Sequence, residues 1–381
     1  MGTTLSSGHN HPLVIHWNGG SWSTRSAPGT DAGFAAVSGT GSNDLWAVGS
    51  SSSGLLAEHW DGLAWSVAPV PTPGIYANGL GGVAALAPDD VWAVGESQSY
   101  DASKYWTYWH WDGAGWSVLP GTTSDPVAGR GVIAAGSDDV WALADRPYGD
   151  VSQKIRHWDG TGWASVDPVP LLRPGLTPFL LGGIKVGTAI WAVGGIRFHP
   201  STFAERICPV AVTGGGFSTP RPDGKIPTTT IAWTIPSGDA HAHSIVDASG
   251  LGLFDSGLRD PGGSFLFGFP AAGSYRVMDG VTGNGMTVRI RPTVKPGSGD
   301  TSTDFVIDWM DGAPPEGCVN DVQIKRPGDV SFHTLVLGDQ SGGIDFFPDA
   351  GPGTYRFRAR LRLADSTAGT WWSPSISIAV H

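Results

Sequence analysis

Histidine and aspartate, which can bind metal ions or transfer protons, recur at fixed spacing in the first half of this 381-residue chain. The motif His-Trp-Asp/Asn-Gly recurs in steps of 43, 51 and 47 residues, beginning at His16, His59, His110 and His157. A catalytic group is needed once, whereas this motif is present four times, and Asn18 replaces the aspartate in the first copy. We therefore interpret the histidines as packing residues and the aspartates as turn residues that accept backbone hydrogen bonds, namely Asp61, Asp112 and Asp159.

Two other histidine groups have loose metal-ligand spacing. His9 and His11 precede His16 in what we expect to be an N-terminal tail, and His241 and His243 form a close pair. We favour no metal site and no cofactor, and keep weak metal binding by the second pair as an alternative. The glycine-containing stretches lack the strand-to-helix context of a phosphate-binding loop, and no G-x-S-x-G motif occurs.

A second motif alternates strictly with the first and indicates how these residues are positioned. It reads NDLWAVG, DDVWAVG, DDVWALA and TAIWAVG, at 43–49, 89–95, 138–144 and 188–194. Trp, Val and Ile favour strands, and Asp-Gly favours a tight hairpin, so each motif predicts one hairpin. Twelve of the 18 tryptophans occupy repeated motif positions, which indicates sheet packing.

Two hairpins per repeat predict a four-stranded blade of a β-propeller, a fold whose repeats have this length. The expected blades span 33–70, 79–122, 128–170 and 178–219, the last with a degraded outer hairpin at 210–217. The hairpin at 12–24 has no partner hairpin before it, which leaves four and a half blades. Either it closes the ring as a short fifth blade, which we favour, or the chain is the end of a longer propeller.

The long connections between hairpins are the expected binding surface. Because antiparallel connections alternate between the two ends of a sheet, the segments 70–79, 97–108, 145–154 and 196–206 share one face of the propeller. Aromatic rings with a few basic groups suit a sugar or a protein partner. The candidate ligand-binding residues are Tyr76, Tyr100, Tyr105, Trp106, Arg146, Tyr148, Arg197 and His199. Alternatively, Trp106 only continues the strand that leads to Trp109.

Composition indicates an all-β protein without membrane insertion. The chain has 57 glycines and 29 prolines, and only 15% of its residues are charged. A net charge of -11 argues against binding to nucleic acid. We expect an extracellular or cell-surface protein whose export signal is not present in this chain, and no disulfide framework, because Cys208 and Cys318 fall in different expected domains.

Residues 221–294 resemble a cupredoxin-like β-sandwich of secreted bacterial proteins, on the stretches AHSIVDASGLGLFDSG and FGFPAAGSYRVMDG. In that family a histidine early in the domain and a later Cys, His and Met hold copper. His243 stands at the early position, but Asp279 and Thr282 replace the cysteine and the second histidine, with Met286 near the methionine position. A blue-copper site needs a thiolate and two imidazoles, so we expect a metal-free domain.

Residues 295–381 resemble a fibronectin type III domain. Trp309 matches its early core tryptophan and Tyr355 its tyrosine corner, and WSP at 372–374 matches the entry to its last strand. Arginines alternate along 356–362, so all share one face of a strand. We expect a solvated face, with an anion or partner site as the alternative; the arginines are Arg356, Arg358, Arg360 and Arg362.

The repeats of residues 1–220 resemble the HWDG/DDVWAVG β-propeller repeats of exported bacterial proteins, a resemblance that implies no particular activity. We therefore expect a non-catalytic recognition or adhesion protein that binds a glycan or a surface protein on the propeller loop face. One alternative is a building block of an extracellular filament, fibre or envelope assembly that self-associates through the open edge of the N-terminal hairpin. Another is a propeller glycan hydrolase or lyase, which requires an acidic pair among the connections.

Overall fold

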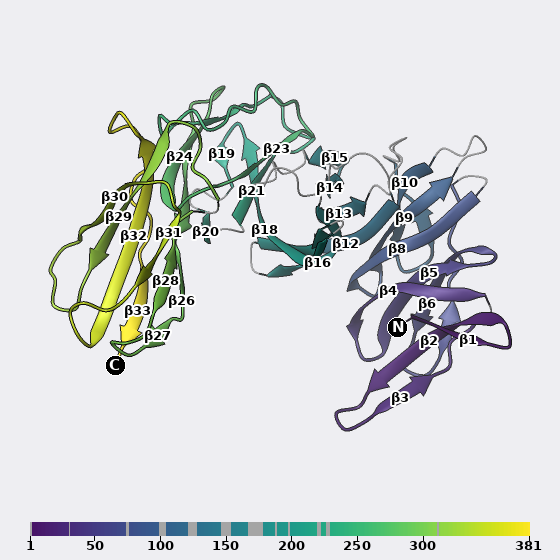
Figure 1. Cartoon of the computed structure of the whole chain (residues 1–381). Helices are drawn as coiled ribbons and strands as arrows, with labels where there is room; N and C mark the ends of the chain where they lie inside the picture. The colour runs from purple at the N-terminus through teal and green to yellow at the C-terminus, as the bar shows by residue number, and fades with distance from the viewer. Residues whose placement is uncertain are drawn as a thin grey trace. The chain divides into compact units, whose positions relative to one another are not determined.

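The structure is a computed structural model that describes residues 2–29, 31–73, 76–98, 104–120, 128–145, 154–166, 178–186, 189–196, 199–218, 222–225, 229–310 and 312–381. Its regular elements are all strands within these residues (Figure 1), which confirms the expected all-β class. The chain divides into two compact units. Unit 1 comprises Met1–Pro168 and Thr177–Ala204, and unit 2 comprises Val169–Leu176 and Glu205–His381.

Unit 1 contains antiparallel sheets that follow one another along the chain. The first comprises β1 (Gly2–Ser6), β2 (His9–Trp17) and β3 (Trp22–Arg25). The second comprises β4 (Ala32–Gly41), β5 (Asp44–Ser51), β6 (Gly54–Trp60) and β7 (Trp65–Val67). The third comprises β8 (Tyr76–Ala87), β9 (Asp90–Gln98), β10 (Lys104–Trp111) and β11 (Trp116–Val118). The fourth comprises β12 (Ala128–Gly136), β13 (Asp139–Asp145), β14 (Lys154–Trp158) and β15 (Trp163–Val166), and the fifth begins with β16 (Pro178–Val186) and β17 (Ala189–Ile196).

Each repeated motif forms the hairpin that the sequence predicts. The WAVG segment is the second strand of its sheet, and the HWDG segment forms the hairpin of the third and fourth strands. In the second sheet, for example, Trp46 of β5 pairs with His59 of β6, and Trp60 pairs with Trp65 across the turn. The expected strand composition of the repeats is therefore confirmed.

The sheets of unit 1 pack in chain order through their first strands: β4 contacts β8, β8 contacts β12 and β12 contacts β16. Glycine permits this close approach. A Cβ atom on Gly81 of the third sheet would collide with the carbonyl oxygen of Gly129 in the fourth, and one on Gly131 of the fourth sheet with that of Leu181 in the fifth. Among the described residues, no comparable packing joins the first sheet to β16 and β17, so the expected ring closure by the N-terminal hairpin does not occur there.

The N-terminal residues form a strand instead of the expected tail. Gly2–Ser6 pairs with β2 through a tight turn at Ser7 and Gly8, both of which have positive φ angles. The N-terminal hairpin therefore has a partner strand, and the prediction that its edge is unpaired is wrong. His9 lies within this sheet and contacts the Asp31 carboxylate, at 2.9 Å from Nδ1 to Oδ2.

β18 (His199–Thr213) runs from unit 1 into unit 2, because the division falls between Ala204 and Glu205. Its segment Arg206–Ala211 pairs in parallel with Thr229–Thr234. The hairpin predicted within 210–217 exists, since Val212 pairs with Phe217, but it lies in unit 2. The expected domain boundary at residue 220 thus falls inside unit 2.

Unit 2 contains four further groups of paired strands. β18 is followed in its sheet by β21 (Thr229–Thr234) and β23 (Ser264–Gly268), with β19 (Gly216–Phe217) paired to β18. A second sheet has the order β20 (Asp223–Lys225), β25 (Gly285–Arg291), β24 (Gly273–Asp279), β22 (Ile245–Asp247). A third has β26 (Thr293–Lys295), β28 (Phe305–Asp308), β31 (Gly343–Phe346). The fourth has β27 (Ser298–Gly299), β33 (Ile376–Val380), β32 (Gly353–Leu363), β29 (Cys318–Lys325), β30 (His333–Asp339).

The two regions expected as separate domains of unit 2 are joined by backbone hydrogen bonds. The amide of Ala272 donates to the carbonyl of Trp309 at 2.7 Å, and the amide of Ser274 donates to that of Trp371 at 2.9 Å. Large rings fill the interior of each region, with Trp233 and Tyr275 in one and Trp309 in the other. Both cysteines, Cys208 and Cys318, are buried and free.

Candidate functional site

The predicted loop residues are described only in part. Tyr100, Arg146, Tyr148 and Arg197 lie outside the described residues. Tyr76 begins β8 and His199 begins β18, so both lie where a connection meets a strand. Tyr105 lies in β10, is partly exposed and pairs with Ser97.

Trp106 is a correction to the predicted site. Its side chain is fully buried in a cluster with Trp92, Tyr108 and Val132, at the interface of the third and fourth sheets. The guanidinium of Arg156, from the fourth sheet, lies 5.8 Å from the centre of its ring. The ring therefore holds two sheets together, and the prediction that it offers an exposed binding surface is wrong.

The strand register places the expected connections at one end of successive sheets. In the third sheet, Tyr76, Gln98 and Lys104 are paired across the end where 70–79 enters and 97–108 leaves. In the fourth sheet, Ala128 pairs with Asp145 at the end where 145–154 leaves, and in the fifth Pro178 pairs with Ile196 before 196–206. Because consecutive first strands pack together, these ends follow one another along one edge of unit 1.

The repeated histidines bind neighbouring aspartates. His59 Nε2 lies 2.7 Å from Asp44 Oδ1, and the corresponding distances are 2.9 Å for His110 and Asp90 and 3.0 Å for His157 and Asp139. Each of these rings also packs against the tryptophan of its WAVG motif, with centroids 4.7, 4.7 and 4.3 Å apart. The sequence reasoning predicted packing histidines but missed their aspartate partners, whose signal was the aspartate two residues before each of these tryptophans.

The aspartate of the fourth sheet illustrates the electrostatics of this arrangement. Burial of Asp139 opposes its ionisation, but hydrogen bonds from His157 and Trp141 and the ammonium of Lys185 outweigh burial and lower its pKa to about 2. Lys185 belongs to β16, so this contact, at 3.2 Å, joins two sheets. The carboxylate is therefore fixed as a structural anion and is not free to act as a base.

The HWDG aspartates accept backbone hydrogen bonds in their turns, as predicted. Asp61 Oδ1 accepts from the amides of Leu63 and Ala64, both at 2.8 Å. Asp112 and Asp159 make the same pair of contacts. Asn18 does so in the first repeat, with two bonds of 2.9 Å, which explains why an amide can replace the carboxylate there.

The expected copper position of unit 2 holds a buried pair of hydrogen-bonded side chains, His243 and Asp279. His243 Nδ1 lies 2.7 Å from Asp279 Oδ2, and neither side chain is exposed. The hydroxyl of Thr282 donates to the same oxygen at 2.6 Å. Burial opposes ionisation of Asp279, but these hydrogen bonds lower its pKa. Met286 instead accepts a hydrogen bond from Trp233 through its sulfur, and no metal-binding group of His, Cys, Asp or Glu occurs among the described residues.

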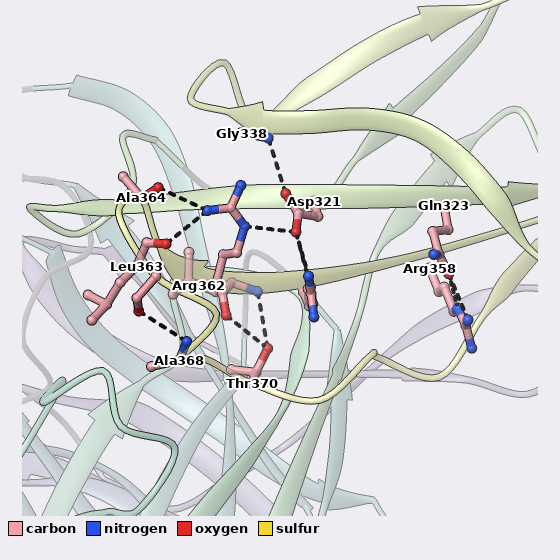
Figure 2. Close-up of polar contacts among 12 residues, drawn as sticks. Asp321, Gln323, Gly338, Arg358, Arg362, Leu363, Ala364, Ala368 and Thr370 are labelled. Carbon is pink, nitrogen blue, oxygen red and sulfur yellow. Dashed lines mark hydrogen bonds and ion pairs between the residues drawn. The ribbon is translucent and has the colours of Figure 1, made fainter.

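The arginines of β32 lie on one face, as predicted, but three of them are only partly exposed. These three pack against aromatic rings or bind polar groups, and Figure 2 shows the polar contacts of Arg358 and Arg362. The guanidinium of Arg358 lies 4.1 Å from the ring centre of Phe332 and 5.0 Å from that of Trp372. It donates two hydrogen bonds to the side chain of Gln323, at 2.9 and 2.6 Å. The expected fully solvated face is therefore corrected to a packed one, in which only Arg356 is exposed.

The buried carboxylate of Asp321 binds both of the other partly exposed arginines. Arg360 and Arg362 each donate to its Oδ2 at 2.9 Å, and the amide of Gly338 donates to Oδ1 (Figure 2). Burial opposes ionisation of Asp321, but the arginines outweigh it and lower its pKa. Arg358 differs from these two arginines, because it donates to the neutral side-chain amide of Gln323, whereas they donate to a carboxylate.

Sequence reasoning missed a further ionisable group, Glu58. Its side chain is fully buried in β6, and neither carboxylate oxygen has a hydrogen-bond partner in the described part of the chain. Burial raises its pKa to about 7. Its position, directly before a motif histidine, corresponds to Trp109 in the next repeat, so the break in apolar pattern was the available signal.

No family model and no curated protein matches this chain. Among solved structures it is similar to YCF48 bound to the D1 peptide, at 13% identity and a TM-score of 0.32, covering 79% of this chain and 84% of that one. It is also similar to the FN1-FN3 domains of chicken CNTN1, at 11% identity and a TM-score of 0.19, covering 66% and 97%. A third is the extracellular domain of a one component system of B. thetaiotaomicron, at 9% identity and a TM-score of 0.21, covering 99% and 57%. At these scores the similarities assign neither a family nor an activity.

Proposed function

We propose that this chain is a non-catalytic recognition or adhesion protein that works outside the cell or on its surface. In this proposal the sheets of unit 1 are propeller blades, and the N-terminal sheet is a short fifth blade that does not close the ring within one chain. The regions before and after residue 295 are two sandwich domains that act as spacers or anchors. The partner is a glycan or a surface protein.

One observation carries the proposal: the ends of the variable connections follow one another along one edge of unit 1. Beneath them, the repeated aspartate, histidine and tryptophan contacts and the packed glycines make a fixed scaffold. Variable loops on a rigid scaffold are a common way to build a binding surface. The net charge of -11 disfavours nucleic acid as the partner.

The test is a binding screen of the full chain against glycan and surface-protein arrays, repeated with the connection variants Tyr100→Ala, Tyr148→Ala and Arg197→Ala. We expect each variant to weaken the binding that the screen detects. The control is Leu63→Ala, because Leu63 is 88% exposed in a turn at the opposite end of the second sheet. Binding that the control reduces and the connection variants leave intact would refute the proposed face.

A further inference from the structure

The joints between sheets of unit 1 share one pattern of tryptophan packing. Trp111 and Trp116 of the third sheet lie 4.8 and 5.2 Å from Trp46 of the second, between ring centres. In the next joint, Trp158 and Trp163 of the fourth sheet lie 5.7 and 6.3 Å from Trp92 of the third. The two rings of an HWDG hairpin therefore cover the WAVG tryptophan of the preceding sheet.

The first sheet carries the two hairpin tryptophans of this joint, Trp17 and Trp22, and both are exposed. Trp17 and Trp22 are paired across its turn, with ring centres 5.6 Å apart. Trp22 is 65% exposed, whereas Trp65 and Trp116, at the same position of their repeats, are each 7% exposed. Ile15 lies on the same face as Trp17 and is also exposed, although its counterpart Trp109 is fully buried. We call this surface, formed by Ile15, Trp17 and Trp22, the head face.

The fifth sheet presents the other half of the joint, which is the sheet face around its WAVG tryptophan. Val193 is 47% exposed, whereas its counterpart Val94 is 1% exposed beneath the fourth sheet. Ile184 is paired with Trp191 and is 62% exposed, whereas Ile133, paired with Trp141 in the fourth sheet, is 4% exposed. Trp191 itself is only partly buried. We call the surface formed by Ile184, Trp191 and Val193 the tail face.

We propose that a second copy of this chain docks its head face on the tail face, repeating between molecules the joint that connects sheets within one. Both halves are exposed in the same molecule, and within the described residues no packing comparable to that of the neighbouring sheets joins the first sheet to the fifth. A contact between two different surfaces adds copies head to tail, which gives a ring or a filament. The inference requires no ligand, so it stands or falls separately from the proposed recognition function.

This contact differs from the self-association expected from the sequence. That expectation relied on an unpaired backbone edge of the N-terminal hairpin. In the structure, β1 pairs with this edge along β2. Here side chains on a sheet face make the contact, so its specificity comes from tryptophan packing. Substitutions of exposed side chains can therefore abolish the contact without changing the pairing of any strand.

The test is sedimentation of the full chain over a wide concentration range, with two variants. The head variant is Trp17→Ser with Trp22→Ser, and the tail variant is Ile184→Ser with Val193→Ser. We expect the wild-type mass to rise with concentration in whole multiples of one chain, and each variant alone to remain a monomer. Mixed together, the two variants should form a complex of two chains and stop there, because each retains one intact face.

Two controls keep the outcome clear. Leu63→Ser removes an exposed apolar side chain outside both faces and should associate like the wild type. Thr24→Arg adds a charge to the head face, since Thr24 is exposed and pairs with Ile15, and it should block association even if the tryptophan variant fails to fold. A wild type that stays monomeric throughout, or a variant mixture that does not pair, would overturn the proposal. Trp17 and Trp22 shielded from a soluble quencher in a monomer would also overturn it, because closure within one chain would then occupy the head face.

Discussion

His157 and Lys185 bind opposite oxygens of one carboxylate, at 3.0 Å from Oδ1 and 3.2 Å from Oδ2 of Asp139, and so connect the fourth sheet of unit 1 to the fifth. Trp141 donates to the same Oδ1 at 2.7 Å. His157 and Asp139, whose residue types could transfer protons, are thus part of the contacts that hold the sheets in place.

We predict that Asp139→Asn destabilises the protein by about 2 kcal/mol near neutral pH, because hydrogen bonds to a charged group contribute about that much. The folded pKa of Asp139, about 2, lies below the usual aspartate pKa of 3.8. Its contribution is therefore complete above pH 3.8 and is lost as the pH falls through 2. Denaturant unfolding of the variant measures the loss. Asp138→Asn, which changes the exposed neighbour, should leave stability within about 0.5 kcal/mol of the wild type.

A second prediction concerns the arginine face of β32. Arg358→Lys should destabilise the protein by about 1 kcal/mol, because lysine cannot keep both hydrogen bonds to Gln323 while lying flat between Phe332 and Trp372. Chemical denaturation provides the measurement. Arg356→Lys changes the exposed arginine two residues earlier on the same face and should have almost no effect. Equal losses from the two variants would show that the aromatic packing contributes nothing.

The turns of the HWDG hairpins were predictable from sequence because the contacts that define them are local. Asp61 and Asp112 accept hydrogen bonds from amides two and three residues later, so the motif itself contains donor and acceptor. Strand identity was also predictable, since it follows from residue type and alternation. The tyrosine corner was recognisable for the same reason, because Tyr355 bonds to Gly351 four residues earlier.

Features that depend on distant partners were not predictable. Trp106 looked like a loop residue, but it is buried because the fourth sheet packs over it, and no local pattern reports that packing. The parallel pairing of Arg206–Ala211 with Thr229–Thr234 joins two short runs that could equally pair elsewhere. β1 was missed because GTTLS is short and largely polar, although the following Ser-Gly is a hairpin signal.

A third prediction concerns the tyrosine corner at Tyr355. The hydroxyl of Tyr355 donates to the carbonyl of Gly351 at 2.9 Å and accepts from the amide of Ala350 at 2.8 Å. Tyr355→Phe removes both bonds and should cost about 1 to 2 kcal/mol of unfolding free energy. The thermal unfolding midpoint should fall accordingly, whereas Thr354→Ala, at the exposed neighbouring position, should leave it nearly unchanged. An unchanged midpoint in the tyrosine variant would mean that water replaces the lost partners.

The last prediction concerns Glu58, which lies between the first and second sheets among the apolar side chains of Val14, Ala47 and Leu56. Its folded pKa of about 7 lies above the usual glutamate pKa of 4.5, because burial penalises the charged form. The folded state therefore prefers the neutral acid. The stability that the neutral Glu58 side chain contributes is fully present below pH 4.5, declines as the pH rises to 7 and stays low above it. The free energy of unfolding at low pH exceeds that at high pH by an amount on the order of 3 kcal/mol.

Glu58→Gln should abolish this decline, since the amide stays neutral at every pH. The variant should be close to the wild type at pH 4.5 and more stable than it at pH 8, as measured by denaturant unfolding at both values. Glu316→Gln, at an exposed position of unit 2, serves as the control, and it should not change the difference in unfolding free energy between the two pH values. The contradicting outcome is a wild type that loses no more stability than Glu58→Gln between pH 4.5 and 8. It would mean that the carboxylate finds a partner or water when it ionises. The packing between the first two sheets would then be looser than the buried contacts of Val14 indicate.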